Sequence, residues 1–125
     1  MAPTRLGLDE KAEAALSYLL GVITSWIFPF PINIILVPVA GIIFLILEPE
    51  NYFVRFHAAQ WTLAAITFII LTLALPSLWI LWSLLRLIVV IIGIIKSLQG
   101  ELYKFPFIGD LAEQFIKPPP PPPPP

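Results

Sequence analysis

Residues 61–96 read "WTLAAITFIILTLALPSLWILWSLLRLIVVIIGIIK" and decide the fold. Two apolar tracts flank Pro76. The second is long enough for a membrane-crossing helix of roughly 20 residues, and the first is too if its helix begins near Tyr52. Because proline lacks an amide hydrogen and disfavours helix in the residue before it, a tight turn is predicted at "PSLW". The stretch therefore predicts two antiparallel helices in a membrane.

The composition of the whole chain supports a membrane location. Of its 125 residues, 58% are apolar and 12% are charged, whereas soluble domains have about 45–50% and 25%. So few charges cannot cover a water-soluble surface. The net charge of −1 gives no basic field for nucleic acid. The absence of cysteine excludes disulfides, thiolate metal sites and cysteine nucleophiles.

Two shorter apolar segments precede the hairpin, separated by "FPFP" at residues 28–31. As one helix they would extend about 48 Å, too long for a hydrocarbon core of about 30 Å. We therefore predict an all-α integral membrane bundle of about four helices over residues 16–28, 32–47, 55–75 and 78–96. The first two either cross as short spans, with a kink at Pro38, or form a re-entrant hairpin.

The charged residues divide the chain into regions and orient it. Residues 1–15 are a polar lead-in, 16–98 the membrane domain, 99–117 a cytoplasmic-face segment and 118–125 a polyproline tail. Six basic residues fall on one side of a four-span arrangement: Arg5, Lys11, Arg55, Lys96, Lys104 and Lys117. The positive-inside rule then places both termini and the loop at 48–60 in the cytoplasm. Aromatic residues mark the outer interface at Trp26, Trp79 and Trp82, and the inner one at Tyr52, Trp61 and Tyr103.

Two polar blocks lie on this inner side, "NYFVRFHAAQ" at 51–60 and "GELYKFPFIGD" at 100–110. Their candidate site residues are Asn51, Phe53, Arg55, Phe56, His57, Gln60, Gly100, Glu101, Tyr103, Lys104, Pro106, Gly109 and Asp110. A lone histidine makes no metal site, though it could relay protons. We expect instead that these groups hydrogen-bond neighbouring loops and form one surface. In it, acids at 48, 50 and 101 would face bases at 55, 96 and 104.

Arg86 is the one charge placed mid-way in a predicted span, where it costs about 2.5–3.5 kcal/mol. It could line a polar path or contact a substrate. Alternatively it snorkels, or bonds to carbonyls freed around Pro29, Pro31 or Pro38, or lies at a subunit interface. We expect this structural role.

The C-terminal region carries two further predictions. "GDLAEQFIK" at 109–117 is typical of a short interfacial helix with Asp110 as N-cap and Glu113 completing a capping box. The eight prolines at 118–125 are predicted to form a polyproline II segment of about 25 Å. It could bind a polyproline-binding domain, but without a flanking arginine we expect a disordered tail.

Three blocks carry a family resemblance: "GLDEKAEAALSYLLG" (7–21), "GIIFLILEPENYFVRFHAAQ" (41–60) and "IKSLQGELYKFPFIGDLAEQ" (95–114). They resemble small multispanning membrane proteins of uncharacterised function related to the twenty-kilodalton subunit of the chloroplast inner-envelope (Tic) import translocon. The resemblance implies a membrane location and no reaction. Relative to that pattern, residues 25–40 are an insertion. It would be an extra crossing, a re-entrant hairpin or an artefact of gene prediction.

The expected function follows from what the sequence lacks. It has no phosphate-binding glycine loop, nucleophile elbow or histidine pair, so we expect no enzyme and no cofactor. The prediction is a non-enzymatic scaffold or complex subunit in the bilayer, as a homo-oligomer or with other membrane subunits. The alternative is a channel or translocon-like component, which requires water-accessible polar positions around Arg86, Thr67, Thr72 and Ser83.

Overall fold

The computed structural model describes residues 4–29 and 31–116, and this part of the chain is helical with no strand. The helices are α1 (Glu10–Ile27), α2 (Ile32–Leu36), α3 (Val39–Leu47), α4 (Tyr52–Ala74), the 3-10 turn η1 (Pro76–Leu78), α5 (Trp79–Leu98) and α6 (Ile108–Phe115). The all-α prediction is confirmed. The polyproline tail at 118–125 lies outside the described residues.

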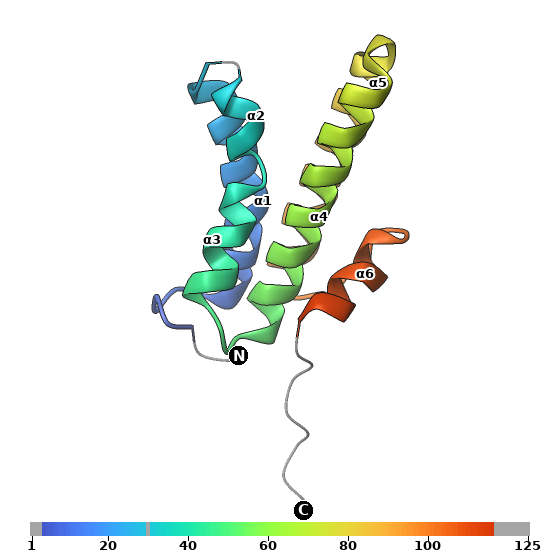
Figure 1. Ribbon diagram of the computed structural model, residues 1–125. Helices are drawn as coiled ribbons and strands as arrows, with labels where there is room; N and C mark the ends of the chain where they lie inside the picture. Colours follow the sequence, from blue (N-terminus) through green and yellow to red (C-terminus); the bar gives the residue numbers. More distant parts are fainter. Residues whose placement is uncertain (1–3, 30, 117–125) are drawn as a thin grey trace, which may run out of the picture.

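The long helices form two antiparallel hairpins (Figure 1). One contains α1 and the α2–α3 pair, and the other contains α4 and α5. α1 packs against α3, α4 and α5, while α6 packs against α4. The hairpins lie close together where α3 joins α4 and diverge toward the α1–α2 and α4–α5 turns (Figure 1).

Local sequence explains where the helices begin and end. The carboxylate of Asp9 caps α1 by accepting from the Lys11 amide at 2.8 Å. The side chain of Asn51 caps α4 by accepting from the Val54 amide at 3.0 Å. At the other end α4 stops at Ala74, two residues before Pro76, as the sequence predicted.

Two of the described helices are long and apolar enough to cross a membrane, Tyr52–Ala74 and Pro76–Leu98. At 23 residues each, they extend about 34 Å. The four-span prediction is not confirmed. α1 begins among polar residues rather than at 16, and the segment Ile32–Leu47 is short and interrupted at Pro38. That proline divides the segment into two helices, because its ring prevents a continuous helical ladder.

Glycines allow the hairpins to approach closely. A Cβ on Gly21 would lie 2.5 Å from the Trp61 indole, and one on Gly93 would lie 2.5 Å from the Tyr18 ring. Such contacts between small and aromatic residues replace the hydrophobic driving force that helices lack in lipid. Trp61 is fully buried and donates to the Val37 carbonyl at 3.1 Å. The prediction that it marks an interface is therefore wrong.

Candidate functional site: a polar cluster between the hairpins

A fully buried histidine lies where α1, α4 and the 100–105 segment meet. The two ring nitrogens of His57 each have a partner: Nε2 lies 2.8 Å from the Glu101 carbonyl and Nδ1 lies 2.8 Å from the Tyr18 hydroxyl. Because a carbonyl can only accept, Nε2 carries the hydrogen and Nδ1 accepts from Tyr18. The imidazole therefore joins two segments of the chain through a single defined tautomer.

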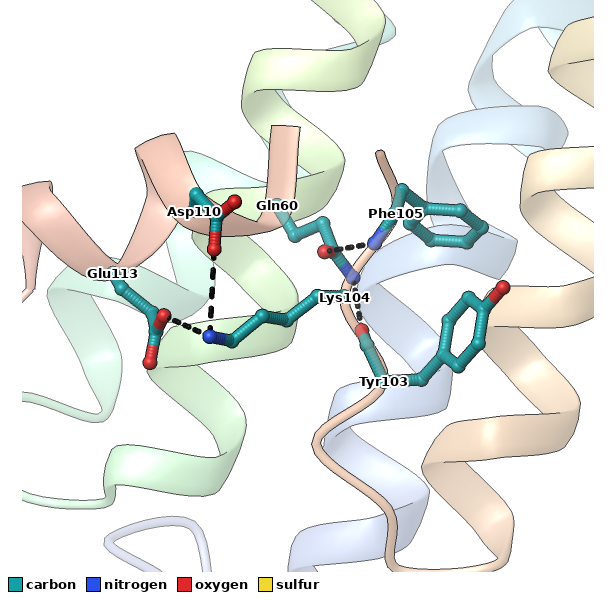
Figure 2. Close-up of polar contacts among 6 residues, drawn as sticks. All are labelled: Gln60, Tyr103, Lys104, Phe105, Asp110 and Glu113. Carbon is teal, nitrogen blue, oxygen red and sulfur yellow. Dashed lines mark hydrogen bonds and ion pairs between the residues drawn. The ribbon is translucent and has the colours of Figure 1, made fainter. Parts of the chain in front are cut away.

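Gln60, one turn further along α4, binds the same segment through its carboxamide. The amide nitrogen donates to the Tyr103 carbonyl at 3.0 Å and to the Tyr18 hydroxyl at 3.1 Å. The amide oxygen accepts from the Phe105 backbone N–H at 3.0 Å. Figure 2 shows the carboxamide facing the backbone of Tyr103 and Phe105, as a neighbouring peptide group would. We call the side chains of Tyr18, His57 and Gln60 the polar cluster.

Other residues of the 51–60 block support this cluster. The rings of Phe53 and Phe56 contact the imidazole edge-on, with centroids 4.8 and 5.4 Å away. The amide of Asn51 donates to a Glu10 carboxylate oxygen at 3.1 Å, which ties the starts of α4 and α1 together. Arg55 donates to the Leu45 carbonyl, so its guanidinium satisfies the end of α3.

The 100–110 block contributes backbone more than side chains. Gly100 has φ +76°, which turns the chain after α5 toward the cluster. Gly109 is buried against Lys104, and a Cβ there would lie 2.9 Å from the Gln60 amide oxygen. Pro106 is exposed, and its carbonyl accepts from the Ile108 amide at 2.7 Å.

Charge pairing in the 100–110 block differs from the prediction. Lys104 pairs with Glu113 and, at 3.4 Å, with Asp110 (Figure 2). The hydrogen bond that the Lys104 ammonium donates to the Glu113 carboxylate raises the pKa of Lys104, and Asp110 adds to the effect. α6 begins at Ile108 after Phe107 and has no side-chain cap, so the predicted capping box at Asp110 is wrong. The turn at Pro106 explains the difference, because it starts the helix before Asp110. Of the predicted acid–base pairs, Glu101 with Lys96 forms, at 3.1 Å.

Two buried carboxyl groups lie beside the start of α1. Glu48 accepts from the Arg5 backbone N–H at 2.6 Å and is almost fully buried. Glu13 is fully buried next to it. Burial raises the pKa of Glu13, and the charge of Glu48 raises it further. Over residues 4–29 and 31–116, no group of three or more histidines, cysteines or acids is arranged to hold a metal ion.

Sequence reasoning missed Tyr18 as a member of the site. It stands among apolar residues of α1, where a single tyrosine is usually read as core. Gln60 was named, yet only the fold reveals that its carboxamide bridges to two backbone groups. One signal could have found Tyr18: a buried histidine needs a hydrogen-bond partner on each ring nitrogen, and a hydroxyl can be that partner.

Arg86 lies apart from the cluster, in the half of α5 nearer the α4–α5 turn. It lines a cavity of about 220 Å³ with Ile34 of α2, Val37 and residues of α4 and α5. Within the described part of the chain its guanidinium makes no hydrogen bond or ion pair. Bonds to carbonyls near Pro29, Pro31 or Pro38, one of the structural alternatives that the sequence left open, are not formed among these residues.

Comparison with known proteins gives the family. The chain matches the magnetosome magnetite crystal formation protein family (MamF/MmsF) over residues 9–112. It belongs to that family.

Its curated relatives are archaeal membrane proteins. A UPF0132 membrane protein from Methanocaldococcus jannaschii is 40% identical, covering 92% of this chain and 96% of the relative. Another from the same organism is 38% identical, with 90% and 74% covered. One from Archaeoglobus fulgidus is 35% identical, with 87% and 97% covered. No solved structure matches this chain.

These matches correct the resemblance inferred from the sequence. The three blocks fall almost entirely within residues 9–112, the part that matches the MamF/MmsF family. The relatives found are UPF0132 membrane proteins from archaea, and nothing links the chain to the chloroplast import translocon. The resemblance was therefore assigned to the wrong family. A membrane protein family without a known specific function is what the comparisons establish.

Proposed function

We propose that this protein is a non-enzymatic membrane scaffold or complex subunit. The proposal rests on the hydrogen bonds that the polar cluster makes within the protein. Both ring nitrogens of His57 and both amide hydrogens of Gln60 are committed to Tyr18 and to the backbone at 101–105. Side chains whose hydrogen-bonding groups are all used in this way hold segments of the chain in place. They have little capacity left to bind or activate a substrate.

The proposed topology has four crossings with both termini in the cytoplasm. The hairpin turns at residues 28–31 and 75–77 carry no charge, while five of the described basic residues lie toward the opposite end: Arg5, Lys11, Arg55, Lys96 and Lys104. α1 and the α2–α3 pair run beside the α4–α5 hairpin, which supports a common membrane orientation. Tags at the termini and within residues 29–31 test this. Both termini are expected on one side and the 29–31 tag on the other. Termini on opposite sides would refute it.

The mass of the assembled protein tests the scaffold role. The full chain, extracted from its own membrane in mild detergent, is expected to run as a defined oligomer or with a partner subunit, above its 14.0 kDa chain mass. A monomer without a partner at every protein concentration would contradict the proposal. The family's description mentions magnetite crystal formation, and the proposal takes only the membrane location from its relatives.

A channel is the second candidate, and the cavity at Arg86 favours it. Thr72 and Ser83 line this cavity beside the arginine. Against it, the hydroxyls of Thr67 and Thr72 both donate to carbonyls of their own helix at 2.8 Å. Purified protein in liposomes should show ion or solute flux if it is a channel, and Arg86→Leu should change that flux. No flux above empty liposomes would exclude this function.

A further inference from the structure

The cavity beside Arg86 combines apolar walls with one positive charge. Ile34 of α2 and Phe68 and Ile69 of α4 line it, and Arg86 of α5 supplies the guanidinium. Its volume is about 220 Å³, against about 30 Å³ for each molecule of liquid water. A group of several heavy atoms therefore fits.

Among the residues that the structure describes, no carboxylate pairs with this charge. Between Glu50 and Glu101 the sequence contains no acidic residue. Among residues 4–29 and 31–116 no hydrogen bond or ion pair reaches the guanidinium. Arg86 is partly buried, and a charge held in a predicted membrane span without a partner is costly, so we expect the anion to come from outside the chain.

The position of Arg86 identifies where that anion comes from. It lies seven residues after Trp79, about 10 Å along the helix, and helical side chains lean toward the N-terminus. The guanidinium therefore points toward the α4–α5 turn. There Trp79 is 60% exposed and also lines the cavity. Exposed tryptophans typically lie at the level of lipid headgroups, and the two hairpins diverge toward this end (Figure 1).

We propose that this cavity binds the phosphate headgroup of an anionic membrane lipid, with Arg86 as the counter-charge and an acyl chain against Ile34 and Phe68. Guanidinium pairs with phosphate through two parallel hydrogen bonds, which favours a phosphate over a point anion. The proposal needs the α4–α5 hairpin to cross the bilayer. It depends neither on the number of other crossings nor on the scaffold role.

The test compares lipids on the purified full chain in neutral detergent. Phosphatidylglycerol is expected to raise the Tm and to remain bound in native mass spectrometry, whereas phosphatidylcholine and inorganic phosphate do neither. Arg86→Gln should weaken phosphatidylglycerol binding about tenfold or more. Lys96→Gln removes the same charge ten residues further along α5 and should leave binding unchanged.

Several results would overturn the proposal. These are equal retention of the two lipids by the wild type, a preference that survives Arg86→Gln, or inorganic phosphate acting as the lipid does. A dimer that dissociates on Arg86→Gln would assign the guanidinium to a second copy of the chain. If Arg86→Gln does not fold, Ile34→Trp fills the cavity with the charge intact. It should abolish the preference, and a retained preference would refute the site.

Discussion

Replacing Gln60 with leucine tests whether the polar cluster holds the C-terminal segment to the helices. Leucine is similar in size to glutamine and fills the buried site with an apolar side chain, but it removes the three hydrogen bonds of the carboxamide. The Phe105 N–H is buried and loses its acceptor, while the Tyr103 carbonyl loses its donor. At about 1–3 kcal/mol for each unsatisfied group, with water able to reach the exposed Tyr103, the expected loss of stability is about 2–4 kcal/mol.

The assay is reversible unfolding in mixed micelles with an increasing fraction of sodium dodecyl sulfate, followed by tryptophan fluorescence. Gln114→Leu makes the same chemical change on the exposed side of α6 and should stay within about 0.5 kcal/mol of the wild type. A Gln60→Leu variant as stable as that control would show that the carboxamide does not hold the segment.

Three further predictions concern packing, pH and backbone strain. Gly93→Ala drives a methyl group into the Tyr18 ring and should cost about 1–3 kcal/mol; unchanged stability in the same assay would contradict the close approach of α5 to α1. The pKa of Glu13 is raised in the folded state above its ordinary 4.5, so its protonated form is favoured on folding. The contribution of Glu13 to stability is then fully present below pH 4.5 and is lost as the pH rises through the raised pKa. Glu13→Gln should flatten that part of the profile, and an unaltered profile would rule out Glu13 as the cause. Phe107 has φ 65° and is 91% exposed, so Phe107→Gly should stabilise the protein by about 0.5–1 kcal/mol; a lower Tm would mean that the ring makes a needed contact.

Much of the helical layout could be predicted from apolar length and proline position. Pro76 separates two tracts that are each long enough to cross a bilayer, and the structure places helices on both sides of it. The number of crossings could not be predicted in this way. It depends on how α1 and the short, divided segment Ile32–Leu47 fit the bilayer thickness, and their lengths are marginal.

The site was less predictable because it depends on contacts between distant segments. His57 and Gln60 were named from the sequence, but their partners are backbone groups that any residue carries. Which carbonyl His57 reaches is set by the left-handed turn at Gly100. Trp61 was misjudged because Gly21 lets α1 approach its indole, and no local pattern shows that approach.

The polar cluster also imposes an order of events during synthesis. Gln60 hydrogen-bonds to Phe105, which is synthesised 45 residues later. His57 hydrogen-bonds to Glu101, which is also synthesised after it. At about 5–20 residues per second, translation takes about 2–9 s to supply these partners. During that interval α4 can insert, but its imidazole and carboxamide have no backbone to bind. Integration of the helices and completion of the fold are therefore separate steps, and a chain released from the ribosome before residue 100 would lack the segment that completes the cluster.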